Sequence, residues 1–478
     1  MKLSELLAGI QITTNQVSGD PEIHEVRYDS RAVQPGDLFV AIRGFETDGH
    51  KYIAAALEKG AAAIVCEQAE PGMPAVVTPS SRQALAQIGA NRFGHPAEKL
   101  TMVGVTGTNG KTTSTYLIKH ILESQGAKVG LIGTNQNLIG DEAIDTERTT
   151  PESYELHALF AHMAEAGCTH CVMEVSSHSL VLDRVYGIRF AVGAFTNLTQ
   201  DHLDFHHTME EYRQAKAILF ANCGKALINM DDPAGEKMLL DAKCPVETFS
   251  VKADSASIVA KDIRLHADSV DFVVSAEEGI SRVHLGIPGG FSVANALTAL
   301  GVCRALDIPL DKAAAALKTA HGVKGRIEVV PTDTDYTVLI DYAHSPDGVE
   351  NVLRAVRGFT KGRVIALFGC GGDRDRTKRP KMGAIAARLA DFCIVTSDNP
   401  RTEQPDAIIA DILEGMKDTR TPKEVIANRP EAIHYALGMA QKDDTIVLMG
   451  KGHETYQEIN HVKHHLDERE IVAAYFEK

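Results

Sequence analysis

The sequence predicts a three-domain α/β protein, and three observations support this fold class. The chain has 478 residues, which at about 150 residues per domain corresponds to three domains. Short apolar and β-branched runs alternate with helical segments along most of the chain, as in parallel sheets with helices on both faces. Polar or glycine-rich segments directly follow several of these runs, at the sheet edge where α/β proteins bind ligands.

The two terminal domains are each expected to hold one sheet. Residues 1–98 are predicted to form a small N-terminal α/β domain, and residues 326–478 a C-terminal Rossmann-like α/β domain. The predicted strands are residues 22–31, 37–42, 62–67 and 74–78 in the first, and 336–343, 363–370, 392–399, 424–428 and 445–452 in the last. Helices are predicted at residues 52–60 and 81–94, and between the C-terminal strands.

Residues 99–325 are expected to form a central domain built on a parallel sheet. Its predicted strands are residues 100–106, 127–133, 170–176, 191–198 and 225–230, and its predicted helices are 112–125, 152–166 and 208–221. Residues 256–288 instead contain stretches with a period of two, which predicts an antiparallel hairpin appended to the sheet. A helix at residues 291–306 is expected to close the domain.

The net charge and the hydropathy of the chain argue against a nucleic-acid-binding protein and against a membrane protein. Lys and Arg total 49 against 64 Asp and Glu, so the formal net charge is 49 − 64 = −15, which argues against binding nucleic acid or an anionic membrane. No apolar run approaches the roughly 18 residues of a membrane span, and no signal peptide is recognised. We therefore expect a cytoplasmic protein with reduced cysteines. Cys168 and Cys171 are interpreted as core thiols, although Cys-x-x-Cys can also be redox-active or bind metal.

The strongest local motif is a glycine-rich loop between a predicted strand and a predicted helix. It contains Gly107, Thr108, Asn109, Gly110, Lys111, Thr112 and Thr113. Glycines allow backbone N–H groups to surround phosphate oxygens at a helix N-terminus, while Lys111 would neutralise β- and γ-phosphates and the Thr112 hydroxyl would reach Mg²⁺. Five residues rather than the usual four separate Gly104 from Gly110, and the alternative is a plain glycine-rich turn. The context predicts an ATP-binding loop and a P-loop ATPase-type central sheet.

Acidic and histidine residues follow two further strands of the central domain. Glu174 ends one strand, and Asn197, Asp201 and His202 follow the next. A carboxylate beside a phosphate loop can hold Mg²⁺, whereas a histidine-rich loop alone is more typical of solvated surface. Lys216 lies in a helical segment without a phosphate motif, and residue chemistry alone would place it on the surface.

Four motifs, in order along the chain, resemble those of the Mur ligases of peptidoglycan synthesis. They are Gly-Thr-Asn-Gly-Lys-Thr-Thr at 107–113, Glu-Val-Ser-Ser-His at 174–178, Thr-Asn-Leu-Thr-Gln-Asp-His at 196–202 and Asp-Tyr-Ala-His-Ser-Pro at 341–346. Segments 28–31, 35–39 and 149–151 resemble the members that extend UDP-N-acetylmuramoyl-L-alanyl-D-glutamate. The resemblance covers essentially the whole chain and implies that residues 1–98 bind the uridine nucleotide.

The resemblance also implies residue roles. Ser30 would contact the uridine nucleotide, and the muramoyl dipeptide would be held by Thr149, Thr150, Ser176 and Arg184. Lys216 matches a lysine that becomes carbamylated and helps bind Mg²⁺ together with Glu174 and His202. Asn295 and Arg326 match nucleotide contacts, and His344 or Asp341 would orient the incoming amine.

The added amino acid is expected to be read by segment 398–401. Asp-Asn-Pro-Arg there is also a common turn sequence, but it resembles the motif of members that add meso-2,6-diaminopimelate. This substrate is lysine with a second carboxylate, which the Arg401 guanidinium could bind in bidentate fashion. The remaining residues of the expected binding site are Arg374, Asp398, Asn399, Pro400, Gly450 and Glu454.

The expected reaction is therefore ATP- and Mg²⁺-dependent amide formation through an acyl phosphate, by a monomer. Three alternatives remain at this stage. The same ligase could use L-lysine, or the chain could be a folylpolyglutamate synthetase-like ligase. A GTPase-like nucleotide switch would need a guanine-reading Asn-Lys-x-Asp motif, which we do not find.

Overall fold

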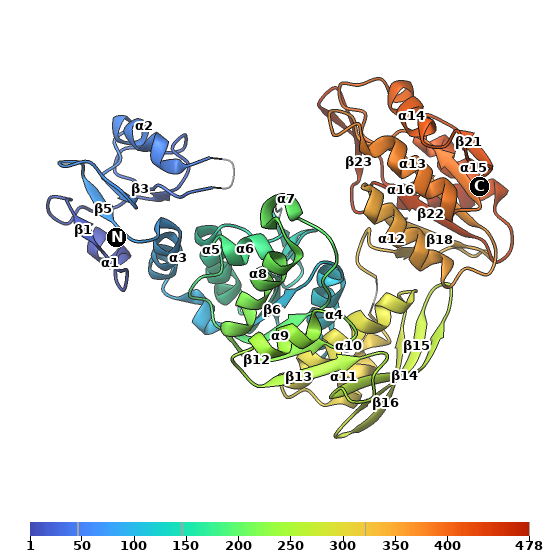
Figure 1. Ribbon diagram of the computed structural model, residues 1–478, viewed down its shortest axis with the longest axis horizontal. Coiled ribbons are helices and arrows are strands. Elements are labelled where there is room, and N and C mark those ends of the chain that lie inside the picture. The colour runs from blue at the N-terminus through green and yellow to red at the C-terminus, as the bar shows by residue number, and fades with distance from the viewer. Residues whose placement is uncertain (45–46, 145, 147, 321, 478) are drawn as a thin grey trace. The chain divides into compact units, whose positions relative to one another are not determined.

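Figure 1 shows the computed structural model, which describes residues 1–44, 47–144, 146, 148–320 and 322–477. Its contacts divide the chain into two compact units. The first consists of Met1–Phe249 with Gly301–Ile308, and the second of Ser250–Leu300 with Pro309–Lys478. The domain boundaries predicted from sequence stay predictions. No helix within the described ranges is long and apolar enough to cross a membrane.

The N-terminal part of the first unit is a five-stranded sheet in the order β1-β5-β4-β3-β2. Its elements are α1 (Leu3–Leu6), β1 (Thr14–Asn15), β2 (Val26–Arg27), β3 (Leu38–Val40), α2 (Ile53–Glu58), β4 (Ala63–Cys66), β5 (Ala75–Val77) and α3 (Ser81–Arg92), with 3-10 turns at Gly49–Tyr52 and Pro96–Lys99. Strands β2 to β5 pair in parallel, and β1 pairs antiparallel with β5. The four strands predicted from sequence are present, whereas the short α1 and β1 were not predicted because neither has a recognisable period.

The rest of the first unit is built on a mostly parallel sheet in the order β13-β12-β11-β6-β10-β7-β8-β9. Its strands are β6 (Thr101–Thr106), β7 (Val129–Ile132), β8 (Asn137–Ile139), β9 (Glu142–Ile144), β10 (His170–Glu174), β11 (Phe190–Phe195), β12 (Cys223–Asn229) and β13 (Val246–Ser250). Its helices are α4 (Lys111–Ser124), α5 (Ser153–Glu165), α6 (Ser177–Val181), α7 (Leu203–His206), α8 (Met209–Ala221) and α9 (Gly235–Asp241). Cys168 and Cys171 are buried in its core, as predicted.

The second unit contains three antiparallel strands and a Rossmann-like sheet. The three strands are β14 (Ile258–Leu265), β15 (Val270–Ala276) and β16 (Gly279–Leu285), where the sequence predicted a hairpin of two. Charged residues at consecutive positions in the outer half of β14 conceal its period of two. Helices α10 (Gly290–Ala305) and α11 (Leu310–Leu317) follow.

The Rossmann-like sheet has the order β17-β18-β22-β19-β20-β21. Its strands are β17 (Glu328–Val330), β18 (Thr337–Asp341), β19 (Val364–Phe368), β20 (Phe392–Val395), β21 (Lys423–Val425) and β22 (Thr445–Met449). Helices α12 (Pro346–Arg357), α13 (Lys378–Leu389) and α14 (Pro405–Glu414) share one hydrophobic core with it, while α15 (Arg429–Met439) and α16 (Glu468–Phe476) share another. A hairpin of β23 (Tyr456–Ile459) and β24 (Val462–His465) follows β22. Parallel pairing places the carboxyl ends of β18, β19, β20 and β22 at one edge of the sheet.

Candidate functional site

The glycine-rich loop joins β6 to α4, as predicted. Helix α4 begins at Lys111, after Gly110 with φ 84°, a left-handed conformation that favours glycine. Gly107 has φ 147°, and a Cβ there would collide with the hydroxyl of Thr196. The loop is held from the next strand by Asn197, whose carbonyl accepts from the Thr108 N–H at 2.8 Å and whose side chain accepts from the Asn109 N–H at 2.8 Å. These contacts fix the loop around the N-terminus of α4, which favours anions.

Two lysines contact the carbonyl of Gly107. Lys111 Nζ donates to the Gly107 carbonyl at 3.0 Å and to the Thr108 carbonyl at 2.9 Å. Lys216 Nζ, which comes from α8, donates to the same Gly107 oxygen at 2.9 Å. The phosphate loop therefore has two lysine side chains beside its backbone rather than one.

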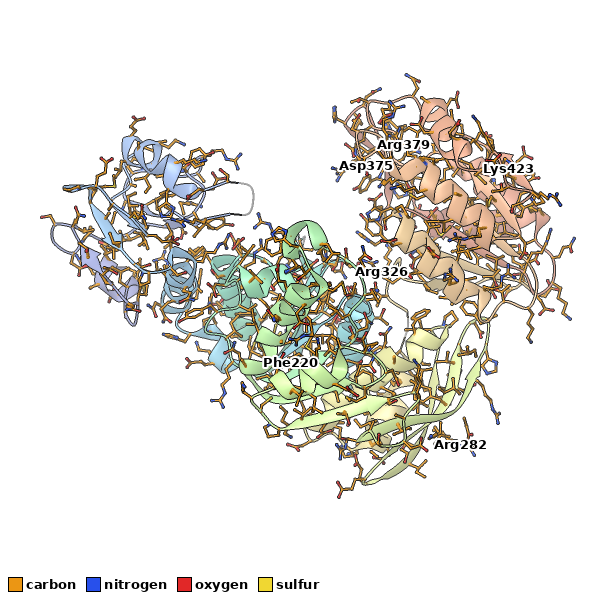
Figure 2. All side chains as sticks on the ribbon, viewed as in Figure 1. Phe220, Arg282, Arg326, Asp375, Arg379 and Lys423 are labelled. Atoms are coloured by element: carbon orange, nitrogen blue, oxygen red, sulfur yellow. The ribbon has the colours of Figure 1, made fainter. Side chains whose placement is uncertain are left out.

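Lys216 is buried, contrary to what its residue chemistry alone predicts. Its side chain is 1% exposed and lies 4.4 Å from the centre of the Tyr212 ring. Burial and the neighbouring Lys111 hold the pKa of Lys216 well below its usual range. The spacing of Tyr212, Lys216 and Phe220 was the signal that sequence reasoning missed. Residues four apart share one helix face, and both aromatic neighbours are buried; Phe220 is labelled in Figure 2.

Glu174 lies at the carboxyl end of β10, beside the phosphate loop. Its Oε1 accepts from the Thr112 hydroxyl at 2.8 Å and from the Thr134 N–H at 2.9 Å, and its Oε2 accepts from the Thr134 hydroxyl at 3.0 Å. The side chain is 1% exposed. A carboxylate and a hydroxyl oxygen at this spacing are hard ligands of the kind that Mg²⁺ prefers, so Thr112 and Glu174 fit a metal site at the loop.

His202 belongs to a separate aromatic cluster. It precedes α7 with φ 52°, and its ring lies 4.8 Å from that of His178 and 3.4 Å (Nε2 to Oδ2) from Asp201. Among the described residues, no three His, Cys, Asp or Glu side chains are grouped so that they could hold a metal. The structure therefore pairs Thr112 with Glu174 but does not preassemble a metal site that includes His202.

A cavity of about 620 Å³ in the first unit contains Ser30 and Arg184 from the expected substrate site. At its wall, the buried carboxylate of Glu152 is contacted by three arginines, Arg82 at 3.2 Å, Arg148 at 3.3 Å and Arg184 at 2.9 Å. Three guanidinium groups around one carboxylate leave a local excess of positive charge, which suits a phosphorylated ligand. Sequence reasoning missed Glu152, Arg82 and Arg148, because no motif links them.

Thr149, Thr150 and Ser176 lie between this cavity and Glu174. The Thr150 hydroxyl donates to the Glu174 carbonyl at 2.9 Å and accepts from the Ser176 N–H at 3.2 Å. The Thr149 hydroxyl is 3.0 Å from that of Thr134, which itself contacts Glu174. Arg184 Nη1 donates to the Thr150 carbonyl at 3.0 Å. The structure thus brings the four expected dipeptide-binding residues into one hydrogen-bonded chain that reaches from the cavity to the phosphate loop.

In the second unit, residues after β20 and β22 form a network that we call the C-terminal charge cluster. It consists of Asp398, Asn399, Arg401, Lys451 and Glu454. The buried Lys451 Nζ donates to Asn399 Oδ1 at 2.9 Å and to Glu454 Oε2 at 3.0 Å, and Asn399 Nδ2 donates to the same Glu454 oxygen at 2.9 Å. Sequence reasoning did not select Lys451, although it lies in the quoted Gly-Lys-Gly-His-Glu segment.

Asp398 is the most deeply buried acid of the cluster. Burial by itself would raise the pKa of Asp398, but Lys451 and Arg429 outweigh burial and hold the pKa below its ordinary value. Gly450 has φ 115°, and a Cβ there would collide with Asp398 Oδ2. Only glycine therefore allows β22 to end this close to the carboxylate.

The remaining expected site residues are placed less tightly. Arg374 is exposed in the loop after β19, and the Pro400 carbonyl closely approaches Gly372 in the same loop. Asn295 is 6% exposed on α10. Arg326 (Figure 2) lies 5.6 Å from the centre of the Tyr342 ring.

His344 and Asp341 lie at the end of β18. His344 is exposed, with Nδ1 2.8 Å from the Tyr342 carbonyl. Asp341 accepts from the N–H groups of Ile327 and Ala343 at 2.8 Å each, and burial raises its pKa. Both carboxylate oxygens of Asp341 thus bind backbone, which indicates a structural role for that residue and leaves His344 as the group able to approach an amine.

A phosphate loop at the edge of a parallel sheet, with a carboxylate on the neighbouring strand and a second Rossmann-like sheet, defines a nucleotide-binding α/β enzyme. The sequence matches the Mur ligase family catalytic domain over residues 22–93, the Mur ligase middle domain over 105–303, and the Mur ligase glutamate ligase domain over 325–452. The chain belongs to the Mur ligase family, as the motifs predicted.

Individual relatives match over the full length. The chain is 49% identical to the UDP-N-acetylmuramoyl-L-alanyl-D-glutamate--2,6-diaminopimelate ligase of Caldanaerobacter subterraneus subsp. tengcongensis, over 99% of this chain and 98% of that protein. It is 47% identical to the ligase of the same name from Clostridium tetani, over 100% of both. A solved structure of a ligase with this name superposes with a TM-score of 0.74 at 31% identity, covering 100% of this chain and 99% of the other.

Proposed function

We propose that this chain is the ATP-dependent ligase that joins meso-2,6-diaminopimelate to the D-glutamate of UDP-N-acetylmuramoyl-L-alanyl-D-glutamate in peptidoglycan synthesis. The full-length similarity to ligases of that name supports this assignment. The observation that carries the choice of amino acid is Arg401, whose guanidinium lies at the strand ends of the C-terminal domain, beside the Glu458 carboxylate and the Gly372 carbonyl. L-lysine is not favoured as the substrate.

The reaction consists of two substitutions. A D-glutamate carboxylate oxygen attacks the γ-phosphorus of ATP, the bond to the bridging oxygen breaks, and ADP leaves. The amine of diaminopimelate then attacks the acyl carbon of the acyl phosphate, loses a proton and displaces inorganic phosphate. In each step negative charge is redistributed over phosphoryl oxygens. Cationic groups fixed near those oxygens therefore lower the activation barrier.

The phosphate loop supplies the groups for the first step. The backbone N–H groups at the start of α4 would hold the β- and γ-phosphates, and Lys111 would leave the Gly107 and Thr108 carbonyls to pair with them. Thr112 and Glu174 would hold Mg²⁺, which when bound offsets the negative charge of the phosphates. His202 and a modified Lys216 are proposed, together with Glu174, as ligands of a further Mg²⁺.

The environment of Lys216 supports its carbamylation. A carbamate forms when a neutral amine attacks CO₂ and one proton is released. The lowered pKa of Lys216 increases the fraction of neutral amine near pH 7, and burial protects the product from water. The product places a carboxylate beside the phosphate loop.

The first unit also offers a site for the nucleotide-linked substrate. The excess of guanidinium groups around Glu152 would attract the diphosphate of the UDP moiety, and Ser30 lines the same cavity. Thr149, Thr150, Ser176 and Arg184 would hold the dipeptide between this cavity and the phosphate loop. The substrate would thus extend toward Glu174, where its terminal carboxylate must meet the γ-phosphate.

Selection of the amino acid is assigned to the C-terminal charge cluster. Diaminopimelate brings a second carboxylate that lysine lacks, so lysine would forgo the hydrogen bonds that the Arg401 guanidinium offers to that carboxylate. Asn399, Pro400, Gly450 and Glu454 would shape this site with Arg374 at its rim. A monomeric, cytoplasmic enzyme without nucleic-acid or membrane partners remains our prediction.

The test is ADP release with UDP-N-acetylmuramoyl-L-alanyl-D-glutamate, ATP and Mg²⁺, with either meso-diaminopimelate or L-lysine supplied. Turnover with diaminopimelate, together with a product mass equal to the two substrates less one water, is the expected result. Turnover with lysine at an equal rate would retain the ligase and contradict the assigned amino acid. No turnover with either would contradict the proposed substrate pair.

A further inference from the structure

The side chain of Arg401 is held on two of its three guanidinium nitrogens. Nε donates to Glu458 Oε2 at 3.0 Å, and Nη1 donates to the Gly372 carbonyl at 2.8 Å. Nη2 has no hydrogen-bond partner among the residues that the structure describes. The two side chains are about one-fifth exposed, 20% for Arg401 and 21% for Glu458, so neither is closed off from solvent.

The backbone fixes Glu458 beside Arg401. The Arg401 N–H donates to the Glu458 carbonyl at 3.1 Å, and the Asn460 N–H donates to the Arg401 carbonyl at 2.9 Å. Arg401 itself has φ 52°, a left-handed conformation that is uncommon for arginine. The Glu458 N–H also donates to Asn399 Oδ1 at 2.9 Å. These bonds join the β23–β24 hairpin to segment 398–401, so the pairing of Arg401 with Glu458 is part of the local fold.

Three other nearby acids are already matched to cations, and a fourth, Asp373, accepts from the Thr402 hydroxyl at 2.6 Å. Glu454 accepts from Lys451 at 3.0 Å, and Asp398 lies near Lys451 and Arg429. Glu403 is engaged by the fully buried Arg379 (labelled in Figure 2), which also donates to the Gly371 carbonyl. Glu458 is therefore the acid that the fold assigns to Arg401.

We propose that Glu458 is a positioning residue for diaminopimelate selection, which holds the Arg401 guanidinium so that its Nη2 edge faces the distal carboxylate of the amino acid. The inference rests on the proposed function and extends it to a residue outside the Asp-Asn-Pro-Arg motif. A long arginine side chain has many rotamers, and fixing it before binding lowers the entropic cost of forming the bidentate contact. The negative charge of Glu458 opposes the attraction between Arg401 and the incoming carboxylate. Glu458 therefore favours binding through the orientation that it gives the guanidinium and not through its charge.

Glu458→Ala and Glu458→Gln separate orientation from charge. E458A should raise the KM for meso-diaminopimelate about tenfold, with kcat and the KM values for ATP and the UDP substrate changed less than about twofold. E458Q keeps an oxygen acceptor for Nε and should stay within about twofold of the unmodified enzyme. L-lysine has no distal carboxylate for Arg401, so its low kcat/KM, measured at high concentration, should be unaffected by E458A.

The matched control is Glu470→Ala. Glu470 pairs with His465 at 2.7 Å at the other end of the hairpin, and both side chains are exposed. E470A should leave all KM values unchanged. An E458A enzyme that loses diaminopimelate and lysine turnover equally, or loses thermal stability with unchanged KM, would overturn the inference. E458Q as impaired as E458A would also overturn it. Absence of diaminopimelate turnover in the unmodified enzyme would instead contradict the proposed function itself.

Discussion

The phosphate-loop region and the C-terminal charge cluster lie at the same kind of sheet edge but are built differently. The phosphate loop is local, because its segment 104–113 is contiguous and is held by two successive residues, Thr196 and Asn197, that follow the adjoining strand. The C-terminal charge cluster is assembled from segments about 50 residues apart and depends on buried charged side chains. The first arrangement can serve any reaction that uses a nucleotide triphosphate, whereas the second can be adapted to one amino acid.

This contrast predicts that substitutions in the first region remove the chemistry, while those in the second change selectivity or stability. The largest effect is expected for Lys111→Ala. Loss of the cation at the γ-phosphate should lower kcat at least about 10³-fold, since removing one group that stabilises transition-state charge has effects of this size. Steady-state ADP release measures it. Lys99→Ala, at an exposed position before β6, is the control; a comparable loss there would contradict the assignment.

Asp398→Asn tests the buried charges of the second region. Removing this carboxylate leaves Lys451 and Arg429 under-compensated and should lower the free energy of unfolding by about 3 kcal/mol near pH 7. Because the folded-state pKa is lowered, the stabilisation is present above about pH 4 and is lost as pH falls through the folded pKa. The difference between D398N and the unmodified protein should therefore shrink below pH 4, as measured by denaturant unfolding. The exposed Asp375→Asn (Figure 2) should have little effect.

Lys216→Ala tests the modified lysine in the first region. Loss of the proposed carbamate should lower kcat about 10²-fold with little change in the KM for diaminopimelate. A short-chain carboxylic acid added to K216A should restore part of the activity, because it can occupy the position of the carbamate. Intact-mass or ¹³C measurements on the unmodified enzyme with labelled bicarbonate provide a second readout. Full activity of K216A would show that the carbamate is not needed.

Gly450→Ala is expected to have the smallest effect of the four. The added Cβ meets Asp398 Oδ2 and is strained at φ 115°, so the KM for diaminopimelate should rise roughly tenfold. Gly126→Ala is the matched control, because Gly126 also has positive φ (88°) but would meet no atom within 4 Å. If the two substitutions raised the KM for diaminopimelate equally, backbone strain alone would account for the change.

Local features of the molecule were predictable from sequence, and long-range ones were not. The period of apolar residues located the strands of both main sheets, and the loop before Lys111 was recognised from its spacing and context. Glu174 was found because it ends a strand next to that loop. Lys216 required the family resemblance, although its spacing from Tyr212 and Phe220 marks the buried face of α8.

The side-chain networks depend on contacts that no local pattern encodes. Glu152 contacts Arg82, Arg148 and Arg184, which lie up to 70 residues away along the chain. Only Arg148, four residues before Glu152, has a spacing that a sequence pattern could suggest. Glu458 reaches Arg401 across 57 residues. Such pairs follow from the topology of the sheets, which the sequence predicts only in outline.

The most direct test of the account is the ratio of kcat/KM for meso-diaminopimelate to that for L-lysine, measured for the unmodified enzyme and for Arg401→Ala. We predict a ratio of about 10⁴ in the unmodified enzyme. We expect it to fall at least about 100-fold in R401A, with the KM for ATP unchanged within about twofold. An unchanged ratio in R401A would contradict the assignment of amino-acid selection to the C-terminal charge cluster.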